Sequence, residues 1–137
     1  MTRTLQRTVC LGVLLALFAW VGCGSGGPEL GEVAGTVKLG GQPLADAKVI
    51  FQPEKGGSPS TATTDASGHY ELMFTADREG AMIGKHKVTV STFRQKSNED
   101  GTTTTIAERV PDKYTRQSTT PELKEVKPGS QEINLEL

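Results

Sequence analysis

The sequence predicts an all-β protein, an antiparallel β-sandwich of about seven strands preceded by a signal peptide. Three observations support this prediction. Short segments in which apolar and polar residues alternate recur along the chain, and Gly-, Pro- and Asp-rich turn signals lie between them. The long amphipathic runs of Leu, Ala, Glu and Lys that are typical of helices are missing. The 137 residues suffice for one domain of ordinary size once a targeting segment is removed.

The first two strands are expected at 32–39 (EVAGTVKL) and 47–53 (AKVIFQP), with the turn chemistry of GGQPLADA near and between them. In each segment every second residue is apolar or glycine, which is the period of a half-buried strand. The inward positions are Val33, Gly35, Val37 and Leu39 in the first strand, and Ala47, Val49 and Phe51 in the second. Glu54 to Ser60 is a loop by composition.

The segment TDASGHYELMF (64–74) carries the clearest hairpin signal in the chain. The Asp65 carboxylate is placed to cap the turn, and Gly68 suits a left-handed position that other residues rarely adopt. Beyond the turn, Tyr70, Leu72 and Phe74 alternate with polar residues. We therefore expect these three side chains to point inward.

The second half of the chain predicts two further strands and several connections. KHKVTVSTF (85–93) and QEINLEL (131–137) alternate as strands do, the latter with Ile133, Leu135 and Leu137 inward. Thr75 to Gly84 is expected to be a connector with room for a short helical turn, and Arg94 to Glu108 a long exposed loop or extended hairpin tip. ERVPDKY (108–114) is expected to be an edge strand anchored by Val110 and Tyr114.

Residues 1–22 have the layout of a secretory signal peptide, with Arg3 and Arg7 before an apolar run from Val9 to Val21 and the small residue Gly22 after it. A permanent membrane helix needs about 20 apolar residues, and this run is shorter. Removing the segment leaves 13 basic and 16 acidic residues. The exported protein is then slightly acidic, which disfavours nucleic acid as a partner.

Only Cys23 survives this processing, because Cys10 lies within the segment that is removed. An intramolecular disulfide is then impossible, and an unpaired thiol is a liability in an oxidising compartment. Val21, Gly22 and Cys23 resemble the lipobox of bacterial lipoproteins, with Trp20 where leucine is usual. The resemblance implies cleavage before Cys23, a diacylglyceryl group on its sulfur and acylation of its amine by a fatty acid such as palmitate.

Cys23 is thus the expected site of lipid attachment, and the Gly-rich segment 23–31 is the expected flexible tether. Two or three acyl chains hold a protein firmly at a membrane, whereas one holds it marginally. The resemblance also implies that Gly24 permits transfer to the outer membrane. The alternative is an ordinary signal peptide followed by a soluble secreted protein in which Cys23 is incidental.

GTVKLGGQPLADAKVIF (35–51) and TDASGHYEL (64–72) resemble the carboxypeptidase regulatory-like domain, a transthyretin-like sandwich of the immunoglobulin-like architecture. GKHKVTV, VPDKY and VKPGSQEINLEL resemble the same domain in small lipoproteins of planctomycete-type bacteria, so the resemblance covers 32–137. It implies an accessory or adhesion-type β-domain without chemistry of its own. Envelope proteins or polysaccharide are the partners expected of such a domain.

Few residues suggest catalysis or metal binding, so we expect neither an enzyme nor a cofactor. His86 is expected to be a partly buried strand residue and His69 to face solvent, and no cysteine remains to complete a zinc site. DASG (65–68) supplies one carboxylate, too few for a calcium loop, and a solvated loop tip explains NEDG (98–101), where weak calcium binding is the lesser alternative. The C-terminus INLEL lacks the Tyr-Arg-Gly-Ser ending of transthyretin-like hydrolases that act on 5-hydroxyisourate.

Carbohydrate binding is the remaining alternative, because β-sandwiches often bind sugars on aromatic side chains. Most aromatic residues of the expected domain fall on inward positions, where core packing explains them. Phe93 is the exception, because it lies where a strand meets the polar loop. The sequence therefore predicts a membrane-anchored cell-envelope lipoprotein with a binding or accessory domain, exported and facing the periplasm or the exterior.

Overall fold

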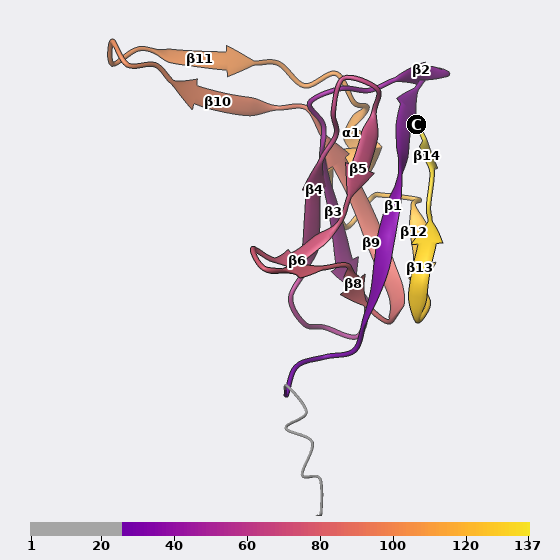
Figure 1. Ribbon diagram of the computed structural model, residues 1–137. Helices are drawn as coiled ribbons and strands as arrows, with labels where there is room; N and C mark the ends of the chain where they lie inside the picture. The colour runs from indigo at the N-terminus through magenta and orange to yellow at the C-terminus, as the bar shows by residue number, and fades with distance from the viewer. Residues whose placement is uncertain (1–25) are drawn as a thin grey trace, which may run out of the picture.

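A computed structural model describes residues 26–137, which form two packed β-sheets and a separate two-stranded arm (Figure 1). These residues contain fourteen strand segments and one helix of four residues. The prediction of an all-β sandwich is confirmed. The number of segments exceeds seven because several strands are interrupted or very short.

The first sheet is built around β1 (Leu30–Leu39). Its antiparallel partners are β2 (Gln42–Pro43), β5 (His69–Glu71) and β8 (Ala81–Met82). The C-terminal segments β13 (Gly129–Glu132) and β14 (Leu135–Glu136) pair with β1 in parallel. β1 begins at Leu30 rather than at Glu32, because Leu30 and Gly31 already pair with Met82 and Ala81.

The second sheet has the order β12, β9, β3, β4, β6 and β7 and is antiparallel throughout. Its strands are β12 (Leu123–Val126), β9 (Gly84–Ser91), β3 (Lys48–Pro53), β4 (Ser60–Thr63), β6 (Met73–Thr75) and β7 (Arg78–Glu79). The arm consists of β10 (Arg94–Ser97) and β11 (Thr103–Ile106). The single helix, α1, spans Asp112–Thr115.

The core lies between the two sheets, and it is formed by the alternate residues that the sequence places inward. Phe51 is fully buried at its centre, with its ring centroid 6.3 Å from that of Tyr70 and 5.8 Å from that of His86. The other large buried side chains come from both sheets: Val33, Val37, Val49, Leu72, Val88, Val90, Val126 and Leu135. The longer strands β1 and β3 contribute to this core through alternate residues, which explains the period-two pattern.

The turn at 65–68 has the expected chemistry, but it does not join a hairpin. The Asp65 carboxylate accepts hydrogen bonds from the backbone amides of Ser67 and His69 at 2.8 and 3.0 Å, and Gly68 has φ +77°. A Cβ on Gly68 would lie 2.6 Å from the Val37 carbonyl oxygen. The flanking strands β4 and β5 then enter different sheets, so the turn connects the two layers.

The chain changes sheet again after β5, and this explains why Phe74 does not point inward as the sequence predicted. Tyr70 and Leu72 are buried as expected, but Phe74 is only half-buried. β6 has left the first sheet and pairs with β4 and β7, so Phe74 does not continue the inward row of β5. Its ring instead packs against the Arg78 guanidinium, whose carbon lies 5.4 Å from the ring centroid.

Two connections differ from expectation. The connector after Thr75 contains strands β7 and β8 instead of a helical turn. The expected edge strand at 108–114 is wrong, because residues 112–115 form α1. Pro111 has no amide hydrogen for a β-ladder, and its carbonyl accepts a bond from the Tyr114 amide at 2.9 Å. Val110 and Tyr114 are nevertheless buried, as anchors should be.

The C-terminal segment 131–137 is interrupted between β13 and β14. At the interruption, the Ile133 carbonyl accepts a bond from the Tyr70 hydroxyl at 2.6 Å, and the Ile133 amide donates to the Ala34 carbonyl at 2.8 Å. A Cβ on Gly35 would lie 1.9 Å from that Ile133 oxygen. Glycine at position 35 therefore lets the C-terminal segment approach β1 closely at Ile133.

Candidate functional site

The arm formed by β10 and β11 projects away from the sandwich (Figure 1). The two strands pair antiparallel from Arg94 with Ile106 to Ser97 with Thr103, and no residue from 94 to 106 is buried. The backbone amide of Asn98 closes the tip by donating to the Thr102 carbonyl at 2.8 Å. The polar stretch at 94–108 is thus an extended hairpin, one of the two forms that the sequence predicts.

The base of the arm is organised by the Glu108 carboxylate. It accepts hydrogen bonds from the Thr92 amide and hydroxyl, both at 2.8 Å, from the Val110 amide at 3.0 Å and from the Ser91 hydroxyl. Desolvation raises the pKa of Glu108, but these hydrogen bonds outweigh it and lower the pKa to about 2. The charged carboxylate therefore holds together the two segments of the chain that enter and leave the arm.

Two arginines at the arm base contact the loop between β2 and β3. Arg94 lies 3.3 Å from the Asp46 carboxylate, and Arg109 donates to the Ala45 carbonyl at 2.8 Å. Phe93 lies beside them with 54% of its surface exposed. The base of the arm thus combines an exposed aromatic ring with guanidinium groups. The sequence predicted the exposed position of Phe93 but not the arginines beside it.

The acidic sequence NEDG (98–101) forms the tip of this arm. One Asp100 oxygen accepts bonds from the Thr102 hydroxyl and amide at 2.6 and 2.9 Å, and these bonds lower the pKa of Asp100. The Asp65 carboxylate is used in the same way by Ser67 and His69, which lowers its pKa. Both acidic stretches therefore have structural roles as turn caps.

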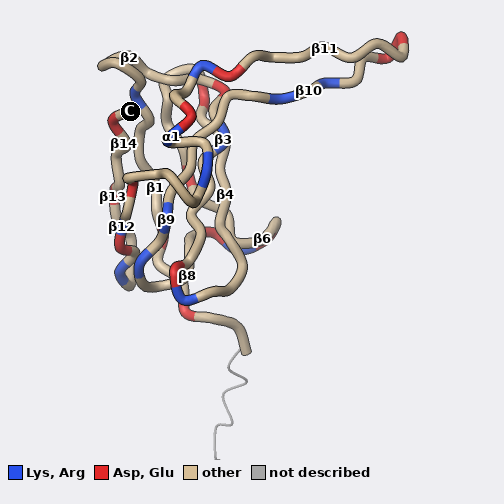
Figure 2. Tube along the Cα trace, turned by 180° about the vertical axis from the view of Figure 1, so that it is seen from behind, with Lys and Arg blue, Asp and Glu red and all other residues tan. Residues whose placement is uncertain are grey.

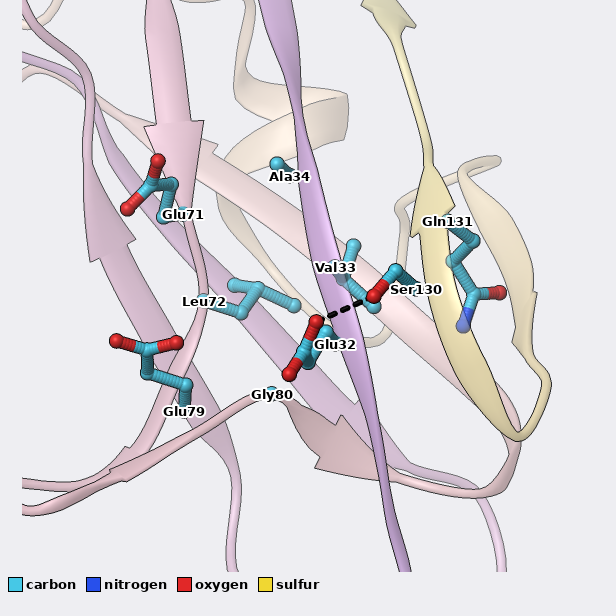
Figure 3. Close-up of a pocket in the computed structure, with 9 residues that line it drawn as sticks. All are labelled: Glu32, Val33, Ala34, Glu71, Leu72, Glu79, Gly80, Ser130 and Gln131. Atoms are coloured by element: carbon cyan, nitrogen blue, oxygen red, sulfur yellow. Dashed lines mark hydrogen bonds between the residues drawn. The ribbon is translucent and has the colours of Figure 1, made fainter.

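A small hollow opens on the outer face of the first sheet, and three carboxylates line it (Figure 3). Glu32, Glu71 and Glu79 come from β1, β5 and β7, and the hollow has a volume of about 180 Å³. Glu32 already accepts a hydrogen bond from the Ser130 hydroxyl. Within residues 26–137, no group of three or more His, Cys, Asp or Glu side chains is arranged to hold a metal ion.

Both histidines occupy the places that the sequence predicts. His86 is 1% exposed, and its Nε2 lies 2.6 Å from the Met82 carbonyl oxygen, which makes this nitrogen the donor. Its Nδ1 is buried and has no hydrogen-bond partner in the structure. His69 is exposed, with Nε2 3.5 Å from a Glu71 oxygen. His86 is thus a core residue packed on Phe51, and His69 is a surface residue.

Cys23, the expected site of lipid attachment, lies outside the described residues, as does the expected signal peptide 1–22. The chain enters the described part at the end of the sandwich opposite the arm (Figure 1). There Arg78 donates to the Pro28 carbonyl at 3.0 Å. None of the helical structure within 26–137 is long and apolar enough to cross a membrane.

These features define a β-sandwich domain with a protruding polar arm. No model of a known family matches the sequence, and no curated protein is similar to it. Among solved structures, the major pilin subunit BcpA of Bacillus cereus is 14% identical over 80% of this chain and 30% of its own, with a TM-score of 0.45.

A DUF3823 family protein from Parabacteroides merdae is 13% identical, over 80% of this chain and 46% of its own, with a TM-score of 0.41. A 9R-lipoxygenase from Cyanothece is also 13% identical, over 77% of this chain and 16% of its own, with a TM-score of 0.40. This chain therefore spans less than half the length of each of these proteins.

Proposed function

We propose that this chain is a non-enzymatic cell-envelope lipoprotein, anchored to a membrane by lipid on Cys23 and presenting a carboxypeptidase regulatory-like β-sandwich. The observation that carries the proposal is the position of Cys23. It is the one cysteine left after removal of the signal peptide, and it stands directly at the end of the apolar run. An unpaired thiol is otherwise a liability in the oxidising compartment of an exported protein.

The geometry of the domain supports this proposal. β1 begins at Leu30, a few residues after Cys23, at the end of the sandwich opposite the arm (Figure 1). An anchor at Cys23 would hold that end near the membrane and leave the arm facing away from it. Surface proteins or envelope polysaccharide would then meet the arm and the loops around it first.

The polar residues of the domain support an accessory role over an enzymatic one. Glu108, Asp65 and Asp100 are each occupied by hydrogen bonds that hold turns or the arm base, and His86 is packed in the core. These groups bond to other parts of the domain, whereas a catalytic group would be free to contact a substrate. The function is therefore proposed to be binding.

Detergent partitioning of the full chain, expressed in a bacterial host, tests the anchor. We expect the wild-type protein in the detergent phase, with a processed N-terminal peptide that starts at Cys23 and carries the mass of the lipid. Cys23→Ala should move the protein to the aqueous phase. Cys10→Ala is the matched control and should change nothing, because Cys10 lies in the segment that is removed.

Recovery of processed wild-type protein in the aqueous phase, with a free thiol on Cys23, would contradict the anchor. It would favour the alternative of a soluble secreted module that binds carbohydrate or protein. Glycan binding that is lost in Phe93→Ala would then assign that module to carbohydrate, since Phe93 is the exposed aromatic ring beside the arm.

A further inference from the structure

The arm has little to stabilise it on its own. A two-stranded hairpin is marginal in water unless it packs against further structure, and residues 94–106 have no buried member. Only its base is tied to the sandwich, through Glu108, the ion pair of Arg94 with Asp46 and the bond from Arg109 to the Ala45 carbonyl. Additional strands beside the hairpin would supply the missing pairing.

The outer edge of β11 has backbone groups available for such pairing. The Asn98 amide bonds to the Thr102 carbonyl, so this pair is a hydrogen-bonded one. Hydrogen-bonded and non-hydrogen-bonded pairs alternate along an antiparallel ladder. In the observed register the pairs of Thr103 and Thr105 are then non-hydrogen-bonded. Their N–H and C=O groups therefore point away from β10 into solvent.

This edge is short, but its side chains do not block strand addition. Soluble proteins block such edges with charged residues, especially Lys, or with Pro. The segment TTTTIA (102–107) has neither, whereas β10 on the other side of the arm carries Arg94 and Lys96. The side of the arm open to strand addition is thus β11.

Charge along the arm favours a second copy of the chain as the added strand. The acidic residues Glu99 and Asp100 lie at the tip, whereas Arg94, Lys96 and Arg109 lie along β10 and at the base, where Glu108 and Asp46 offset part of their charge (Figure 2). In an antiparallel pair of arms, the tip of each lies beside the base of the other. The acidic tip of one arm then lies beside the base of its partner, where the three basic residues outnumber the two acidic ones.

We propose that β11 pairs with β11 of a second copy across a twofold axis at Thr105, which joins the two arms into one four-stranded sheet. This register places Thr105 opposite Thr105 and Thr103 opposite Ala107. An axis at Thr104 would instead place Asp100 opposite Glu108, and like charges directly opposite each other are destabilising. The inference goes beyond the lipid anchor and does not require it.

Cysteine cross-linking of the full-length protein in its host membranes tests the register. Thr105→Cys should form a disulfide-linked dimer on mild oxidation, because paired residues on adjacent strands lie within disulfide reach. Thr103→Cys is the matched control on the same edge and should form none alone, yet it should link to a co-expressed Ala107→Cys chain. The wild-type chain reports any cross-linking through its own cysteines.

A proline variant tests the edge independently. The Thr105 amide points outward, so Thr105→Pro should leave the β10–β11 ladder intact and abolish the link between Thr103→Cys and Ala107→Cys. An unchanged thermal unfolding temperature would show that the fold is retained. Labelling of Thr105→Cys by a maleimide without dimer formation would overturn the proposal, as would equal cross-linking by Thr103→Cys and Thr105→Cys. Cross-linking only to another protein would overturn the second copy as the occupant.

Discussion

Glu108→Gln is the substitution that most directly tests how the arm is held. The glutamine side chain has nearly the same size, but it replaces one acceptor oxygen by an NH₂ group among donors. Those donors are the amides of Thr92 and Val110 and the hydroxyls of Ser91 and Thr92. At least one of them loses its acceptor in the variant, which costs free energy when the group is shielded from water.

The magnitude follows from the pKa of Glu108, which falls from 4.5 to about 2 on folding. At about 1.4 kcal/mol per pKa unit, this difference corresponds to an upper limit of about 3 kcal/mol. Glu108 is partly exposed, and solvent screening reduces the contribution to about 1–2 kcal/mol. We therefore expect Glu108→Gln to lower the free energy of unfolding by about 1–2 kcal/mol at pH 7.

The pH dependence of unfolding tests the contribution of Glu108 independently. The unfolded chain protonates Glu108 near pH 4.5, whereas the folded chain does so only near pH 2. Its stabilisation is therefore complete above about pH 4.5 and is lost as the pH falls toward 2. The difference between wild type and Glu108→Gln should shrink over the same interval.

Urea unfolding followed by circular dichroism at several pH values measures this difference. Glu99→Gln at the arm tip is the matched control, and it should change the free energy of unfolding by less than about 0.5 kcal/mol. Equal effects of the two substitutions at pH 7 would refute the assigned role of Glu108. A difference that stays constant down to pH 2 would do the same.

Two further substitutions test the close approach of the C-terminal segment to β1 at Ile133. Gly35→Ala places a Cβ 1.9 Å from the Ile133 oxygen and should destabilise the fold by about 1–3 kcal/mol in thermal unfolding, whereas Gly26→Ala, with open space around it, should not. Tyr70→Phe removes the hydroxyl that donates to Ile133 and should cost about 1 kcal/mol in urea unfolding. Because burial raises the pKa of Tyr70, its ultraviolet tyrosinate signal should appear only on unfolding as the pH is raised. Early ionisation would show that Tyr70 is not buried as described.

The sequence predicted the strands best where one face is buried, because apolar and polar residues then alternate along the strand. Val49 and Phe51 show this directly. It also predicted the turn at Asp65 and Gly68, whose chemistry is local. It did not predict that the strands on either side enter different sheets, because the choice of a strand's partner depends on residues far away in the chain.

The candidate site was predictable only in part for the same reason. Polar composition placed 94–108 at the surface, and Phe93 at its margin, but nothing in the sequence distinguished Glu108 from other acidic residues. Its role arises from donors on Ser91 and Thr92, which only the return of the arm brings within reach. The free edge of β11 could not be predicted either. Which residues of β11 point their N–H and C=O groups outward depends on the position of the hydrogen bond between Asn98 and Thr102 at the tip.

The two proposals reinforce each other through concentration. Pairing between two arms without a buried apolar face is expected to be weak in free solution, since the contact is small. Chains anchored through Cys23 would share one membrane surface, with their arms at the same end of the domain. Such confinement raises the effective concentration of one arm near another without adding any contact. The cross-link at Thr105 should therefore be stronger for the wild-type anchor than for Cys23→Ala at equal expression. Cross-linking that is equally strong in the two would mean that pairing does not depend on anchoring.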